Sequence, residues 1–260
     1  MMQVDAVDRV ALLLAQAQRV LFITGAGVSA DSGLPTYRGI GGLYHERLTA
    51  EGLTIEEALS GEMMARRPDI SWKYIAEIEG NCRGARPNAA HRLIAAFERE
   101  KDLVCVLTQN VDGLHAEAGS RQLIEIHGNI RRLRCNDCMQ ARQVPDYAGL
   151  QIPPECPRCG GTLRPDIVLF GEPLPAGAVA RLEHVLEAGL DLIVSIGTSS
   201  VFPYIAGPVM WAARQGLPTV EVNPGDTAVS RFVEYRLRMG ASDALHELWY
   251  RTHPREPAED

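Results

Sequence analysis

The sequence predicts an α/β fold in which one doubly wound parallel sheet carries a second, smaller lobe. Five apolar runs have the length of buried parallel strands, and helical patterns lie between several of them. Alternating strands and helices are typical of a doubly wound sheet. Two further stretches fall outside the alternation, and we expect both to pack as the smaller lobe on the large sheet.

The predicted strands all run out into small or polar residues. In chain order they cover residues 19–24, 102–108, 122–127, 190–198 and 217–223, with helical patterns over 88–100, 178–188 and 205–215. Turn residues are common after any single strand. Five such ends together favour one continuous polar cleft, because ligands of doubly wound sheets bind beyond the carboxyl ends of the strands.

The domain organisation follows from this alternation. We expect residues 1–39, 87–127 and 166–260 to form the sheet domain. Residues 40–86, a mixed helical pattern rich in Glu, Met and Arg, form the helical part of the smaller lobe, and residues 128–165 form the part that holds two pairs of cysteines.

Composition and charge restrict the classes of partner. The formal charge of −7 provides no general attraction to nucleic acid or to anionic membranes. Asp5 and Asp8 interrupt the apolar pattern at the start, which is unlike a signal peptide, and no apolar run is long enough to span a bilayer. We expect a cytoplasmic monomer that contacts neither nucleic acid nor membranes.

A glycine-rich stretch follows the first predicted strand. Its first six residues, GAGVSA at 25–30, have glycine at the first and third positions and a small residue at the sixth, as dinucleotide-binding loops do. Glycine turns after strands are common, so the pattern alone also fits a simple turn. The continuation DSGLPTYRG at 31–39 predicts a loop that closes over the far end of a dinucleotide, with Tyr37 as a lid and Arg38 facing phosphate.

Four cysteines have the spacing of a metal site. Cys135 and Cys138 form one C-x2-C pair, and Cys156 and Cys159 form another after seventeen intervening residues. This spacing predicts tetrahedral zinc, and four thiolates would close its coordination sphere, so the ion would be structural. A zinc ribbon can also bind nucleic acid, but the basic segment 131–143 stands in an acidic chain.

One of the seven histidines stands at the end of a predicted strand. His127 precedes Gly128, and its imidazole is expected at the polar edge where a dinucleotide would lie. An unperturbed pKa near 6.5 suits a general base. The neighbouring segment TQNVDG at 108–113 supplies two amides and a carboxylate that can hold ribose hydroxyls and a carboxamide.

In order and spacing, GAGVSADSGLPTYRG, TQNVDGLH, HG, the two cysteine pairs, FGE, GTSS and VN resemble the motifs of the sirtuins over about residues 10 to 249. The resemblance implies a Rossmann-like domain with a zinc-ribbon lobe. It also implies an enzyme that consumes NAD to remove acyl groups from lysines of proteins or peptides, giving nicotinamide and O-acyl-ADP-ribose. His127 would be the general base, with Asn110 as a second catalytic residue.

The resemblance also implies binding residues at matching positions. Those for NAD are Gly25, Ala26, Gly27, Ser29, Thr36, Tyr37, Arg38, Gln109, Asn110, Asp112, Gly197, Thr198, Ser199, Asn223 and Ala241. Those for the acyl-lysine peptide are Val168, Phe170, Gly171, Glu172 and Val201. Of these, Phe170 would line the acyl-lysine tunnel, and the others would hold the peptide backbone as an added strand.

Two departures from the family pattern affect the substrate side. Pro203 precedes Tyr204, whereas the family often has Tyr-Pro here. Sirtuins that prefer succinyl or malonyl groups carry a Tyr-x-x-Arg pair where this chain has Ile75 and Ile78. An acyl carboxylate would enter an apolar pocket unpaired, so we expect apolar acyl groups, acetyl first. Both isoleucines also fit simple packing of the helical lobe.

Three alternatives remain from the sequence. The same cleft could serve an ADP-ribosyltransferase or NAD glycohydrolase, which would release nicotinamide without acyl-lysine. The chain could be a zinc-stabilised binding module that senses NAD without turnover. A dehydrogenase is less favoured, because no Tyr-x-x-x-Lys pair stands beside the glycine loop.

Overall fold

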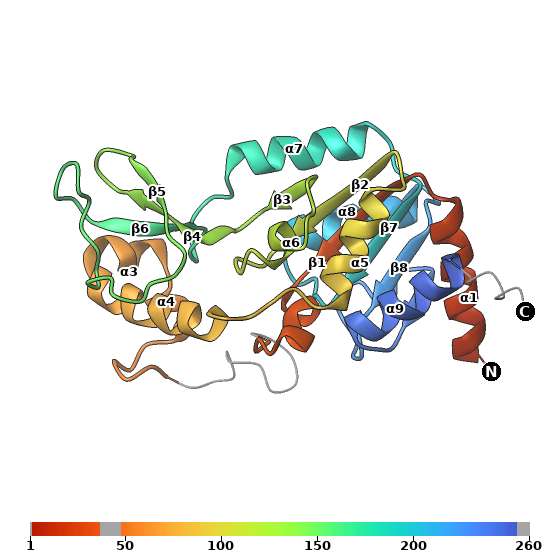
Figure 1. Cartoon of the computed structure of the whole chain (residues 1–260), viewed down its shortest axis with the longest axis horizontal. Coiled ribbons are helices and arrows are strands. Elements are labelled where there is room, and N and C mark those ends of the chain that lie inside the picture. The colour runs from red at the N-terminus through yellow and green to blue at the C-terminus, as the bar shows by residue number, and fades with distance from the viewer. Residues whose placement is uncertain (1, 37–47, 254–260) are drawn as a thin grey trace, which may run out of the picture.

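The computed structural model describes residues 2–36 and 48–253, and in them the chain forms two lobes. Figure 1 shows a large sheet at one end, and a smaller lobe of helices and short strands at the other end. No helix of these residues is both long and apolar enough to cross a bilayer.

The large sheet has six parallel strands in the order β3-β2-β1-β7-β8-β9. Their bounds are β1 Arg19–Thr24, β2 Leu103–Thr108, β3 Leu123–Glu125, β7 Leu192–Ile196, β8 Thr219–Val222 and β9 Tyr235–Leu237. The five predicted strands and the parallel doubly wound arrangement are confirmed. The chain reverses its direction of travel across the sheet between β1 and β7, which is where such folds bind ligands.

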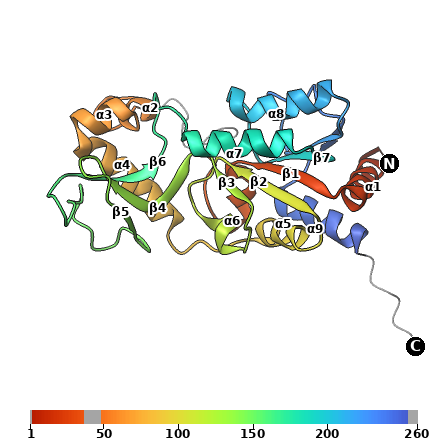
Figure 2. The same cartoon turned by 90° about the horizontal axis from the view of Figure 1, so that it is seen from above.

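Helices cover both faces of this sheet, as Figure 2 shows. On one face lie α1 Met2–Gln16, α5 Ala89–Glu98 and α9 Ala241–Thr252, packed on Val20 and Phe22 of β1. On the other lie α7 Ala176–Glu187 and α8 Pro203–Arg214, packed on Leu21 and Ile23. Successive side chains of a strand point to opposite faces, so a continuous apolar run can be buried on both.

The smaller lobe combines the two stretches that lie outside the alternation. Its antiparallel sheet has the order β5-β4-β6, with β4 Gly128–Cys135, β5 Ala141–Gln143 and β6 Leu163–Ile167. Its helices are α2 Ile55–Ala58, α3 Gly61–Arg66 and α4 Pro68–Cys82. Trp72 of α4 is fully buried, donates its indole N–H to the Leu163 carbonyl at 2.9 Å and meets the Tyr147 ring edge-on.

One hydrophobic core therefore joins the helical and the cysteine-bearing stretches into a single lobe. Strand β6 continues to Ile167, two residues past the border that the sequence suggests at 165. The connection β3 to β4 passes through His127, so this histidine lies where the two lobes meet.

Candidate active site

A cavity of about 840 Å³ lies at the carboxyl ends of the parallel strands, within the range of small-molecule sites. Most residues that the sequence assigns to NAD line it: Gly25, Ala26, Gly27, Ser29, Thr36, Gln109, Asn110, Asp112, Gly197, Thr198, Ser199, Asn223 and Ala241. His127, Ile78, Val168, Phe170, Gly171 and Glu172 line it as well. Tyr37 and Arg38 lie outside the described residues.

The glycines of the first loop allow two backbones to cross at close range. The Gly27 N–H donates to the Gly197 carbonyl at 2.8 Å, and the Gly25 N–H donates to the Ile196 carbonyl at 3.2 Å. A Cβ on Gly27 would lie 2.7 Å from the Gly197 Cα, and a Cβ on Gly197 would lie 2.5 Å from the Gly27 carbonyl carbon. Only glycine fits at this crossing, which sets the loop after β1 against the end of β7.

A short helix follows this crossing. Residues Ala26–Ser32 form a 3₁₀ helix, so Asp31 and Ser32 belong to a helical turn and not to the loop that the sequence suggests. Gly33, with φ of 81°, ends the turn in the left-handed region that favours glycine. The long amphipathic helix of ordinary dinucleotide folds is absent from the described part of this segment.

A buried polar network connects the loop with the end of β2. Ser29 donates its hydroxyl proton to the Asp112 carboxylate at 2.8 Å, and the Leu114 N–H donates to the other carboxylate oxygen at 2.9 Å. The Asn110 amide donates to Ser29 Oγ and to the Gly25 carbonyl, both at 3.1 Å. Burial raises the pKa of Asp112, and the hydrogen bonds from the Leu114 N–H and the Ser29 hydroxyl partly oppose this shift. Because they hold the side chains in one arrangement, the pocket is preorganised.

A second set of hydrogen bonds joins β2, β7 and β8. The Gln109 amide donates to Thr198 Oγ1 at 2.7 Å, and the Asn223 amide donates to the Thr198 carbonyl at 3.2 Å. Thr198 thus links predicted NAD residues from the ends of β2 and β8. These contacts join three of the five polar strand ends that the sequence predicts to form one cleft.

His127 is held with one nitrogen available to accept a proton. Its Nδ1 lies 3.0 Å from the Gln109 carbonyl, which can only accept, so Nδ1 carries the hydrogen and Nε2 carries the lone pair. Burial lowers the pKa of His127 below its usual 6.5, although the hydrogen bond to the Gln109 carbonyl acts in the opposite direction. The imidazole is therefore neutral near pH 7, as a general base must be.

Tyr204 contacts this base, a role that the sequence did not suggest. Its hydroxyl lies 2.7 Å from His127 Nε2. Pro203 takes the first position of α8, where the missing N–H costs nothing, and this places Tyr204 in the first turn of the helix. The reversed order of Pro203 and Tyr204 was visible in the sequence, but the contact depends on how α8 enters the fold.

Residues 168–172, to which the sequence assigns peptide binding, are held by contacts with the smaller lobe. The Phe170 N–H donates to the Leu59 carbonyl and the Gly61 N–H donates to the Phe170 carbonyl, both at 3.0 Å. Glu172 accepts two hydrogen bonds from the Arg164 guanidinium, at 2.5 and 2.8 Å. Burial opposes ionisation of Glu172, but these bonds hold its pKa below the usual range. The Glu172 carboxylate is therefore occupied by Arg164 and holds residues 168–172 against the smaller lobe. Val201 is exposed and is not among the described residues that line the cleft.

The apolar wall of the cleft differs from the sequence expectation at one position. Ile78 lines the cleft, whereas Ile75 is fully buried in the core of the smaller lobe and is not among the described residues that line it. Ile75 lies about one turn before Ile78 on α4, toward Trp72, so it packs inside the lobe. Cys82 lines the cleft together with Leu59, and burial raises the pKa of its thiol to about 12.

The four paired cysteines converge in the smaller lobe. All four sulfur atoms lie within 4.8 Å of one another, with Cys135 and Cys159 Sγ 3.5 Å apart and Cys138 and Cys156 Sγ 3.7 Å apart. Zinc–sulfur bonds of about 2.3 Å in a tetrahedron require sulfur atoms about 3.8 Å apart. The four residues fit a structural zinc ion, and none is among the described residues lining the cleft.

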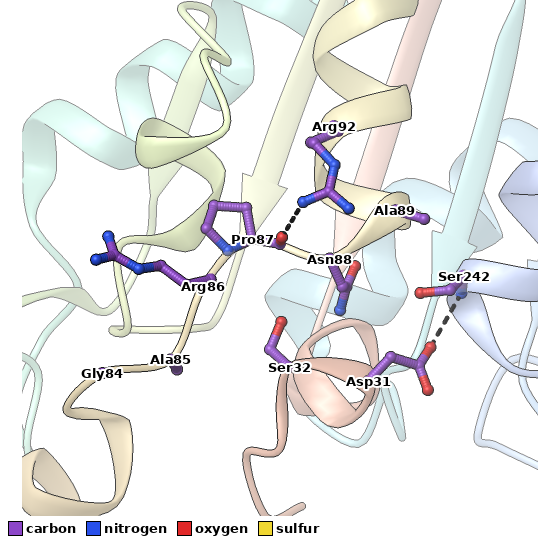
Figure 3. A pocket seen from close by; sticks show the side chains of 10 residues that line it. All are labelled: Asp31, Ser32, Gly84, Ala85, Arg86, Pro87, Asn88, Ala89, Arg92 and Ser242. Carbon is purple, nitrogen blue, oxygen red and sulfur yellow. Dashed lines mark hydrogen bonds between the residues drawn. The ribbon is translucent and has the colours of Figure 1, made fainter.

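A second, shallow opening lies beside the cleft and shares Asp31 with it (Figure 3). The Ser242 N–H donates to the Asp31 carboxylate at 3.3 Å, and Arg92 donates to the Pro87 carbonyl. Arg86 pairs with Glu117 at 3.0 Å. The first contact ties the start of α9 to the 3₁₀ helix after β1. The other two hold the segment that leads into α5.

The fold and site together define a class: a dinucleotide-binding α/β protein with a partly buried histidine in its cleft and a lobe that fits structural zinc. Within that class the family is also defined, because the model of the Sir2 family matches residues 25–203. The chain belongs to the Sir2 family, and its resemblance to sirtuins is confirmed.

Curated relatives agree over nearly the whole chain. The chain is 48% identical over 242 residues to "NAD-dependent protein deacylase 2" of Pseudomonas aeruginosa, covering 92% of this chain and 94% of that protein. It is 36% identical to "NAD-dependent protein deacylase 1" of Archaeoglobus fulgidus, covering 90% of this chain and 93% of that protein.

Solved structures of Sir2 homologues are also similar. A mutant homologue in complex with ADP-ribose has a TM-score of 0.86 at 34% identity, covering 94% of this chain and 96% of that chain. A Sir2 homologue with NAD has a TM-score of 0.84 at 35% identity, covering 95% and 93%. A Sir2 mutant with deacetylated p53 peptide and 3'-O-acetyl ADP-ribose has a TM-score of 0.82 at 28% identity, covering 92% and 96%.

Proposed function

We propose that this chain is an NAD-dependent protein-lysine deacylase that transfers the acyl group to ADP-ribose. The observation that carries the proposal is the neutral His127, whose basic nitrogen lies in the same cleft as the glycine crossing and the buried Asp112. The membership of the Sir2 family and the curated deacylase relatives support the same reaction.

NAD is a co-substrate of this reaction, and the residues present fit it. Residues 25–29, at the start of the 3₁₀ helix, would lie beside the pyrophosphate and ribose, with Thr198 and Asn223 on the adenosine side. The nicotinamide carboxamide would lie near Asn110 and Asp112, which the network with Ser29 holds rigid. A rigid and largely dry pocket stabilises the positive charge that develops on the ribose as nicotinamide leaves.

His127 would then act as general base on a hydroxyl of the nicotinamide ribose. The acyl oxygen attacks the anomeric carbon and expels nicotinamide, and removal of the hydroxyl proton lets the ribose oxygen attack the former acyl carbon. Hydrolysis of the resulting species gives free lysine and O-acyl-ADP-ribose. The Gln109 carbonyl fixes the tautomer that makes Nε2 the accepting nitrogen.

The acyl group would be apolar, acetyl first and longer chains next. Among the described residues that line the cleft there is no Lys or Arg that could pair with an acyl carboxylate. Ile78 and Leu59 are apolar, and the Cys82 thiol is neutral. Leaving a carboxylate unpaired there costs at least about 1 kcal/mol, and more as the site is drier. Acyl-lysine proteins or peptides are the partners that we propose.

Several further properties belong to the proposal. A cytoplasmic location would keep the four zinc-binding thiols reduced. We propose that the chain makes no direct contact with nucleic acid, because it carries a formal charge of −7. We also propose that it is a monomer. The roles given to Val168, Phe170 and Gly171 in holding the peptide also remain proposals, supported by their position on the cleft.

The experiment that tests the function measures nicotinamide release from NAD with and without an acetyl-lysine peptide. A deacylase releases nicotinamide only with the peptide, and in equal amount to the deacylated product. Equal release without any peptide would instead favour an NAD glycohydrolase or an ADP-ribosyltransferase. His127→Ala should abolish product formation, and His184→Ala, at an exposed histidine of α7, is its matched control. If the chain were only a binding module, neither the wild type nor any variant would turn over NAD.

A further inference from the structure

The basic nitrogen of His127 is already hydrogen-bonded in this structure. Because Nδ1 carries the ring proton, Nε2 can only accept, so the Tyr204 hydroxyl 2.7 Å away donates to it. One imidazole nitrogen has a single lone pair. A ribose hydroxyl cannot donate to Nε2 while Tyr204 does.

The Tyr204 side chain is held in this position by its neighbours. Its ring stacks on Phe202 with centroids 5.3 Å apart and an interplanar angle of 11°. The Tyr204 ring also meets the His127 ring edge-on, with ring centroids 5.7 Å apart and an interplanar angle of 85°. The backbone is fixed by the first turn of α8 after Pro203. Tyr204 is thus an ordered part of the site and not a loose surface side chain.

Tyr204 also lines the cleft and is only half-buried. A phenol oxygen carries one proton and two acceptor lone pairs. With its proton given to His127, this oxygen can still accept a hydrogen bond from a hydroxyl in the cleft. The tyrosine hydroxyl can therefore contact the base and a hydroxyl in the cleft at the same time.

We propose that Tyr204 is a catalytic proton relay between the nicotinamide-ribose hydroxyl and His127, an inference that rests on the proposed deacylase function. The ribose O–H bond breaks as its proton passes to Tyr204 Oη. The original Tyr204 proton passes at the same time to His127 Nε2 and forms an N–H bond. Tyr204 is neutral before and after the step, His127 becomes cationic, and the ribose oxygen becomes the nucleophile.

The test compares Tyr204→Phe with the wild-type enzyme in two assays of the full chain with NAD and acetyl-lysine peptide. Formation of O-acyl-ADP-ribose needs the base, whereas exchange of labelled nicotinamide into NAD needs only the earlier, reversible displacement of nicotinamide. Phenylalanine keeps the ring that stacks on Phe202 and removes only the hydroxyl. Tyr250→Phe, on an exposed tyrosine of α9, is the matched control.

The relay predicts that Tyr204→Phe lowers O-acyl-ADP-ribose formation about 100-fold, whereas nicotinamide exchange stays within about threefold of wild type. Adding Tyr204→Phe to His127→Ala should cause no further loss, because both residues act in one proton transfer. Unchanged or faster product formation would overturn the relay and show that the hydroxyl shields the base.

Two other outcomes have distinct meanings. A parallel fall of exchange and product formation in Tyr204→Phe would overturn the relay in favour of a structural role. Absence of O-acyl-ADP-ribose from the wild-type enzyme would instead contradict the proposed deacylase function.

Discussion

Replacing Gly197 by alanine should destabilise the protein much more than the same replacement at Gly216. Both glycines have positive φ, 59° and 69°. A Cβ on Gly216 meets no atom within 4 Å, whereas a Cβ on Gly197 lies 2.5 Å from both the Gly27 carbonyl carbon and the Val28 nitrogen. Both variants therefore have the strain of a positive φ, but only Gly197→Ala also forces two backbones apart.

The magnitudes follow from these two contributions. An L side chain in the left-handed region costs about 1 to 2 kcal/mol, and both variants incur this cost. Forcing a methyl group into a packed site costs a further 1 to 3 kcal/mol or so, and only Gly197→Ala incurs it. The loss of unfolded-state freedom on replacing glycine is the same at both positions and cancels in the comparison.

Urea unfolding of the zinc-loaded variants measures the difference. Gly197→Ala should lower the free energy of unfolding by about 1 to 3 kcal/mol more than Gly216→Ala does. It should also bind NAD more weakly, as seen in a smaller stabilisation by saturating NAD, because the loop after β1 has to move. Equal destabilisation by the two variants would refute the reasoning that glycine is required by the crossing.

Other predictions concern zinc, pH and acyl specificity. The chain should bind one zinc ion, and Cys156→Ala should abolish zinc binding and unfold the smaller lobe. The reason is that structural zinc contributes roughly 10 kcal/mol to the folding of zinc-finger peptides. Zinc analysis measures the bound metal, and circular dichroism measures the loss of structure. Because burial lowers the pKa of His127, the base stays neutral through mildly acidic pH, so deacylation rates at about pH 6.5 and 7.5 should differ by less than about twofold; a pH profile with its midpoint above 6.5 would contradict this. Ile78→Arg should raise succinyl-lysine turnover about tenfold or more through a charge-assisted hydrogen bond and lower acetyl-lysine turnover; parallel peptide assays compare the two.

The sequence predicted the large sheet well because its strands are buried on both faces. Such strands appear as continuous apolar runs, and the polar residues after them identify the edge that binds ligands. Strand β9 was not predicted, because only Leu237 of its three residues is buried and no apolar run marks it. The zinc-binding cysteines were predictable because their spacing is local.

The details of the site depended on contacts that spacing does not encode. Tyr204 and His127 are 77 residues apart, and their hydrogen bond depends on where α8 begins. Ile75 and Ile78 lie three residues apart on one helix, yet only Ile78 lines the cleft. The rotation of α4 about its axis determines which isoleucine faces the cleft. The hydrogen bond from Trp72 to Leu163 of β6 helps to set that rotation.

The most direct test of the central claim is mass-spectrometric analysis of the products formed from NAD and an acetyl-lysine peptide, with His127→Ala beside the wild type. The proposed reaction predicts O-acetyl-ADP-ribose in equal amount to the deacetylated peptide, and almost none from His127→Ala. Formation of free ADP-ribose with the peptide left acetylated, or full activity of His127→Ala, would contradict it.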